Sequence, residues 1–90
     1  MTWLFVSTNF YAILGWTGTV SYLLAYFLLS IHRLKANQVL YHAMNIVGAI
    51  GLTANAFYYA DFPNVVVNVA WGVIALGAIF FIMKKRRMRS

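Results

Sequence analysis

The sequence contains no cysteine and only one acidic residue, Asp61. Without cysteine there can be no disulfide, thiolate metal site or cysteine nucleophile. With one carboxylate, a single chain offers neither the paired acids of a glycosidase nor an acidic metal cluster. His32 and His42 have no carboxylate close in the sequence that could orient an imidazole for acid–base catalysis. We therefore expect a protein that is not an enzyme and that holds no metal and no cofactor.

Charged residues of any kind are scarce. They make up 9% of the 90 residues, against about 25% in soluble domains, while 63% of the residues are hydrophobic. Such a chain cannot cover a globule with polar surface, so the composition indicates an integral membrane protein embedded in a lipid bilayer. Its apolar runs are about as long as a helix must be to cross the hydrocarbon core.

The apolar runs predict an all-α fold, a bundle of three transmembrane helices. The predicted helices cover residues 11–31, 39–59 and 65–83. Together they form one domain, 11–83, which lies between an interfacial segment, 1–10, and a basic tail, 84–90.

The basic residues predict the orientation of these helices. Arg33 and Lys35 lie in the first loop, and the other five lysines and arginines lie in the tail. The positive-inside rule then places the tail and this loop in the cytoplasm, and the N-terminus and the second turn outside. Although the net charge is +6, no aromatic residues alternate with the basic ones, so we expect no nucleic-acid partner.

Small residues recur on all three predicted helices. Gly15 and Gly18 lie on the first, Gly48 and Gly51 on the second, and Gly72 on the third. In membranes such residues let helix backbones approach closely, so we interpret these glycines as helix-packing positions.

The apolar runs contain three asparagines, Asn45, Asn55 and Asn68, and Trp71 lies one turn after the last of them. An amide in hydrocarbon has no water to bond, so each must face protein or a cavity. Antiparallel packing would place Asn55 and Asn68 at similar depth in the outer half of the membrane. Two interpretations remain open, namely a substrate-binding cavity and hydrogen bonds that only join the helices.

The turn between the second and third helices contains Asp61 and the only proline, Pro63. Proline is favoured in the first turn of a helix, and Asp61 could cap the N-terminal amides of the third helix. Tyr58 and Tyr59 suit an aromatic belt at the membrane surface. Tyr58, Tyr59 and Asp61 are also our candidates for residues that gate access to a cavity.

Three segments carry a resemblance to known proteins: GWTGTVSYLLAY (15–26), NIVGAIGLTANAFYY (45–59) and DFPNVVVNVAW (61–71). The chain resembles a family of small bacterial three-helix membrane proteins of uncharacterised function. Over residues 13–83 it is more distantly similar to the SemiSWEETs, the half-size sugar transporters of the PQ-loop superfamily.

In SemiSWEETs an acidic residue, an apolar residue and a proline often precede the third helix, and an asparagine a short way inside it contacts the sugar. Asp61, Phe62, Pro63 and Asn68 stand in those places. The family's proline–glutamine hinge and its second-helix tryptophan are absent. They are replaced by Leu28 with Leu29 and, in a gapless alignment, by Leu52 or a neighbour.

The resemblance implies a multi-pass protein of the bacterial inner membrane in which three helices are half of a transport unit. We then expect a homodimer, with Asn68 and Trp71 facing the shared axis, that carries a small neutral polar solute. The alternative is a non-catalytic accessory subunit packed against a larger membrane complex through its glycine-rich faces.

Overall fold

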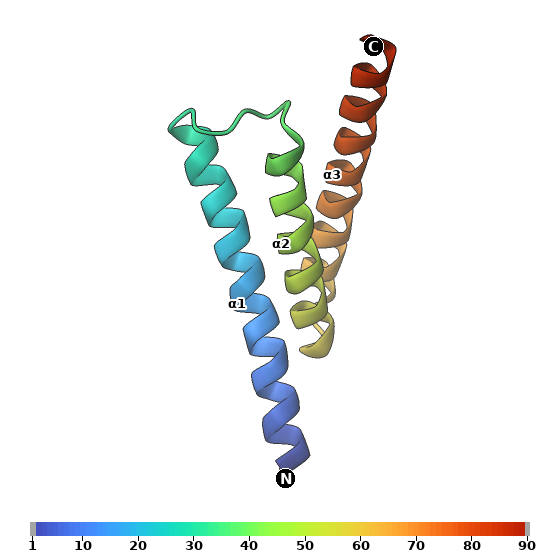
Figure 1. Ribbon diagram of the computed structural model, residues 1–90. Coiled ribbons are helices and arrows are strands. Elements are labelled where there is room, and N and C mark those ends of the chain that lie inside the picture. The colour runs from blue at the N-terminus through green and yellow to red at the C-terminus, as the bar shows by residue number, and fades with distance from the viewer. Residues whose placement is uncertain (1, 90) are drawn as a thin grey trace.

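The computed structural model describes residues 2–89, with side chains from Ser7 to Met88 (Figure 1). Three helices make up this part of the chain: α1 (Thr2–Ser30), α2 (Val39–Tyr58) and α3 (Phe62–Arg89). The predicted all-α fold of three helices is therefore confirmed. Met1 and Ser90, at the ends of the predicted interfacial segment and basic tail, lie outside the described residues.

Helices α1 and α3 extend beyond the apolar runs at 11–31 and 65–83. Helix α1 begins at Thr2, and α3 continues through the basic segment to Arg89. A helix is held by its own backbone hydrogen bonds, and lysine, arginine and methionine are good helix formers, so the helix does not end where the apolar residues do.

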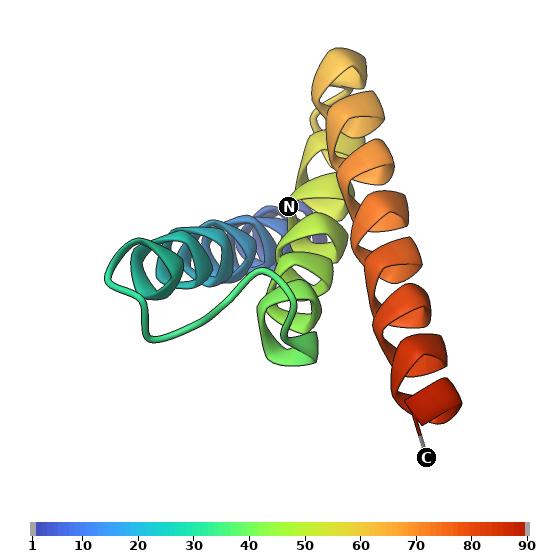
Figure 2. The ribbon, with the colours of Figure 1, turned by 90° about the horizontal axis from the view of Figure 1, so that it is seen from above.

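Helix α2 lies between the other two helices, which diverge from it on either side (Figures 1 and 2). It packs on α1 and on α3, whereas within residues 2–89 no Cα atom of α1 lies within 8 Å of one in α3. The bundle is therefore open on one side, and α2 provides the only extensive packing surface for both neighbours.

The first two helices end in Schellman motifs. At the end of α1, His32 N–H donates to the Leu29 carbonyl (3.1 Å) and Arg33 N–H to the Leu28 carbonyl (2.9 Å). Ala60 and Asp61 make the corresponding bonds at the end of α2. His32 and Ala60 adopt the left-handed backbone that this motif requires, with φ of 64° and 56°. Glycine usually marks such ends, so the sequence gives no sign of either motif.

Glycines form the contact between α1 and α2. A Cβ added to Gly18 would lie 2.8 Å from the Gly48 carbonyl oxygen, and one added to Gly51 would collide with the Leu14 carbonyl oxygen. A Cβ at Gly15 would lie 2.6 Å from Asn55 Nδ2. We call these four glycines (15, 18, 48 and 51) the α1–α2 seam. Because each has a neighbour where a side chain would begin, the seam allows the two backbones to approach closely.

Two of the three helices are long and apolar enough to span a membrane. These are residues Ser7–Ser30 of α1 and Phe62–Met88 of α3, and in an apolar 18-residue stretch of each only 17% and 11% of the residues are buried within the protein. Most of their large side chains are exposed, as with Trp16 and Phe80 at 71% each. A core helix of a soluble protein would be mostly buried. Helix α2 does not meet the same criterion, since polar residues such as His42 and Asn45 interrupt it.

Candidate functional site

Asn55 lies in the contact between α1 and α2. Its Nδ2 donates to the backbone carbonyl of Tyr11 (2.8 Å), next to Gly15. This hydrogen bond joins the two helices, and it gives the Asn55 amide an acceptor that the apolar side chains around it cannot provide. No hydrogen bond joins Asn55 to Asn68 among the described residues.

Asn45 and Trp71 connect α2 with α3. Trp71 Nε1 donates to Asn45 Oδ1 (3.3 Å), and Asn45 Nδ2 donates to the Tyr41 carbonyl (2.8 Å). Asn45 is only 7% exposed, while half of the Trp71 surface remains exposed. The two residues line a small cavity of about 60 Å³ together with His42, too small for more than a water molecule or two.

Asn68 on α3 is hydrogen-bonded to a side chain of α1. The Tyr22 hydroxyl on α1 donates to Asn68 Oδ1 (3.0 Å), and this bond joins α1 to α3 across α2. It forms because the Tyr22 ring lies directly over Gly48, where a Cβ would meet ring carbons at 2.6–2.9 Å. Asn68 Nδ2 also donates to the backbone and side-chain oxygens of Asn64 (3.0 and 2.5 Å).

These bonds leave Asn68 with one free position. Its amide has two N–H groups, both used by Asn64, and an oxygen that accepts two hydrogen bonds, of which Tyr22 supplies one. Asn68 is 5% exposed, so a further donor has to approach through the protein's own groove. A hydroxyl group of a ligand has the right chemistry to fill that position.

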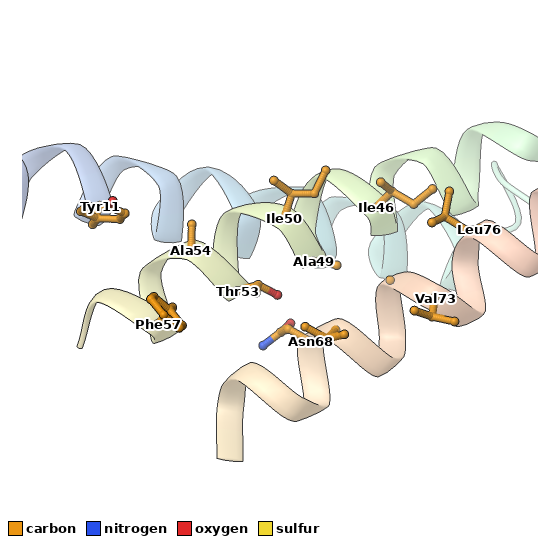
Figure 3. Close-up of a pocket in the computed structure, with 12 residues that line it drawn as sticks. Tyr11, Ile46, Ala49, Ile50, Thr53, Ala54, Phe57, Asn68, Val73 and Leu76 are labelled. Atoms are coloured by element: carbon orange, nitrogen blue, oxygen red, sulfur yellow. The ribbon is translucent and has the colours of Figure 1, made fainter. Parts of the chain in front are cut away.

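Asn68 lines a groove of about 550 Å³ between α2 and α3 (Figure 3). We call it the α2–α3 groove. It is lined by Tyr11, Ile46, Ala49, Ile50, Thr53, Ala54, Phe57, Asn68, Val69, Gly72, Val73 and Leu76. None of these described residues is charged, and the volume is within the 300–1,000 Å³ typical of ligand sites.

Thr53 is another polar residue in the groove, and it was not among the site residues predicted from the sequence. Its side chain projects from α2 toward Asn68 on α3 (Figure 3). Thr19 and Ser30 donate their hydroxyls to the carbonyl four residues earlier, but the Thr53 hydroxyl makes no hydrogen bond among the described residues. The available signal was helical spacing, since Thr53 shares a face with Ala49, one turn before it.

Tyr58, Tyr59 and Asp61 lie at the end of the molecule where α2 turns into α3. The Tyr58 ring stacks on Tyr11 with centroids 4.3 Å apart, and its hydroxyl lies 3.2 Å from Thr8 Oγ1. Tyr58 is therefore fixed to α1, whereas Tyr59 packs edge-on against Tyr58 and is 52% exposed.

The predicted capping role of Asp61 is not what the structure shows. The Asp61 side chain accepts a hydrogen bond from Asn64 Nδ2 (3.4 Å), and among the described residues it accepts none from the backbone amides of α3. Only its backbone carbonyl takes part in the helix, accepting from Val65 N–H (3.1 Å). The carboxylate instead contacts Asn64, which in turn holds Asn68.

The fold and the groove define a small three-helix protein with two candidate membrane-spanning helices. A family model matches residues 11–87, and the chain belongs to that family, whose function is unknown. No curated protein and no solved structure matches the chain. The function must therefore be argued from the groove itself.

Proposed function

We propose that the protein is a three-span membrane transporter in which two copies enclose a small, neutral, polar solute, in the manner of SemiSWEETs. The observation that carries the proposal is the presence of the Thr53 hydroxyl and the Asn68 amide in a groove lined mainly by apolar side chains. Acyl chains of lipid could fill this groove, but they would leave the Thr53 hydroxyl without a hydrogen-bonding partner and the second acceptor position of Asn68 Oδ1 unfilled.

The groove favours an uncharged solute that carries hydroxyl groups. An ion would lose its hydration there without gaining a counter-charge, because the described lining has no charged side chain. Thr53 can donate and accept, and Asn68 Oδ1 can accept one more bond. Apolar walls with a few placed polar groups are typical of sites that bind small molecules.

A second copy is needed because one chain does not close the groove. Ile50, Phe57 and Val73 line it and are still 61–67% exposed. A twofold axis along the membrane normal would place the open groove of one copy opposite that of the other. The groove residues of both copies would then surround one enclosed solute.

Burial of the glycines bears on the alternative, a non-catalytic accessory subunit. The α1–α2 seam is used inside the chain, so it offers no surface to a larger complex. Gly77 is different, since a Cβ built there meets nothing within 4 Å. Gly77 on α3 is therefore the glycine left for an accessory subunit to pack against its complex.

Uptake into liposomes tests the proposal, with Thr53→Val compared with Thr17→Val. Both changes remove one hydroxyl, but Thr17 is exposed on α1 and does not line the groove. In a screen of sugars and other neutral metabolites we expect wild type and Thr17→Val to accumulate the same solute. Thr53→Val should take it up about fivefold more slowly, since one hydrogen bond is worth roughly 1 kcal/mol.

Equal uptake by Thr53→Val and Thr17→Val would contradict the proposed site. Absence of uptake by wild type for every solute in the screen would contradict transport. In that case, loss of co-purification with a membrane complex in Gly77→Leu would support the accessory role.

A further inference from the structure

A second pocket lies at the opposite end of the molecule from the turn that contains Asp61. It has a volume of about 440 Å³ and is formed by the loop between α1 and α2 and by the last part of α3. Three of its described lining residues are cationic: Lys35 from the loop, and Lys85 and Arg86 from α3. Two segments that are far apart in the sequence thus place their positive charges in the same pocket.

No acidic side chain of this chain can neutralise these three charges. The only one is Asp61, which follows the far end of the 20-residue helix α2 and so lies about 30 Å away. At that distance, several Debye lengths at physiological salt, its attraction is screened out. Like charges gathered in a hollow repel one another unless an anion lies between them. The pocket therefore has the charge of an anion site.

The other residues of the pocket indicate which anion fits. Gln38 Oε1 accepts a hydrogen bond from the Lys35 backbone N–H (2.8 Å), so its amide nitrogen is the end that remains to donate to a ligand. Phe81 and Ile82 form an apolar wall one turn before the cations, and Phe81 is 67% exposed. A phosphate accepts from all of these donors, while an apolar wall suits a molecule that also carries a hydrocarbon chain.

We propose that this pocket binds the phosphate of an anionic phospholipid headgroup, with Lys35, Lys85 and Arg86 on the phosphate and the acyl chain along Phe81. The inference requires the helices to lie in a bilayer, and it does not depend on transport or on pairing of two chains. Basic pockets between helices at the membrane surface are suited to such headgroups.

Two double variants with the same net charge test the proposal. Lys35→Gln/Lys85→Gln removes two cations from the pocket, while Arg33→Gln/Lys84→Gln removes one from the same loop and one from the same turn of α3 outside it. Both lower the net charge from +6 to +4. All four residues are exposed, so helix content by circular dichroism should be unchanged.

Native mass spectrometry of the full chain in mild detergent can count bound phosphatidylglycerol and phosphatidylcholine with matched acyl chains. We expect one phosphatidylglycerol per chain, bound at least tenfold more tightly than phosphatidylcholine. The pocket variant should lose about 30-fold in affinity, at roughly fivefold per cation, and the charge-matched control less than about threefold. Inorganic phosphate at millimolar concentration should not displace the lipid.

Equal losses in the two double variants would overturn the proposal, because they would show diffuse attraction to the basic end and no site. Displacement by inorganic phosphate would overturn the lipid assignment in favour of a free phosphate. Extraction of the protein from vesicles by alkaline carbonate would instead show that the membrane location itself is wrong, which separates that failure from failure of the pocket.

Discussion

Gly18 is a position at which a single methyl group should clearly disturb the fold. In Gly18→Ala the new Cβ would lie 2.8 Å from the Gly48 carbonyl oxygen and 3.0 Å from the Leu52 backbone nitrogen. Ordinary contact begins at 3.4 Å, so the two helices must separate by about 0.6 Å (3.4 − 2.8). Both obstructing atoms are backbone atoms, which cannot rotate away as a side chain can.

The cost follows from the contacts that this separation weakens. A gap of 0.5–1 Å removes about a quarter to a half of the attraction between atoms that were in contact, and it acts along the whole interface between α1 and α2. Overpacking of this kind typically costs about 1–3 kcal/mol, and we expect Gly18→Ala to lower the free energy of unfolding by that amount.

Gly77→Ala is the matched control, because a Cβ at Gly77 meets nothing within 4 Å. In the same helical backbone, alanine there should be neutral or stabilising by up to about 1 kcal/mol. Titration with sodium dodecyl sulfate in mixed micelles, followed by circular dichroism, compares the two unfolding midpoints. If Gly18→Ala and Gly77→Ala unfold at the same midpoint, the close approach of α1 and α2 described here is refuted.

Two further changes test the helix ends and the orientation. Ala60→Gly should raise the free energy of unfolding by about 0.5–1 kcal/mol because Ala60 has a φ of 56°, whereas Ala36→Gly should lower it because the backbone at Ala36 is not left-handed. The same detergent titration measures both changes. Destabilisation by Ala60→Gly would contradict the Schellman motif. Because the sequence has no cysteine, single cysteines introduced at the same positions can report the topology. In intact spheroplasts a membrane-impermeant maleimide should label Ala60→Cys but not Ala36→Cys. The reverse labelling pattern would show that the predicted orientation is inverted.

Local pattern was enough to predict three helices and both ends of α2. A run of apolar residues marks a segment that is buried in lipid or protein, and the run at 39–59 agrees with α2 (Val39–Tyr58). The boundaries that pattern misses are those of α1 and α3, which continue into polar residues. Pattern also led to Asn68, because an uncompensated amide in an apolar run must have a partner somewhere.

The hydrogen-bonding partners of these side chains could not be predicted, because they depend on the rotation of each helix about its axis and on which helix lies in the middle. Nothing in the spacing of residues predicts that Tyr22 reaches Asn68 across Gly48, or that Asn55 bonds to the Tyr11 carbonyl. The same is true of Thr53, because the face that α2 presents to α3 places its hydroxyl in the groove with Asn68.

The sequence by itself determined that this chain forms long apolar helices with its positive charge at one end, because composition and hydrophobic periodicity act locally and need no neighbour. Tertiary structure alone decided that α2 lies between α1 and α3, that the glycines of the α1–α2 seam are used within the chain, and that Lys35 and Lys85 line the same pocket. The physical reason is that side chains of a given type fit equally well against several neighbours, and only close packing of the backbones selects one.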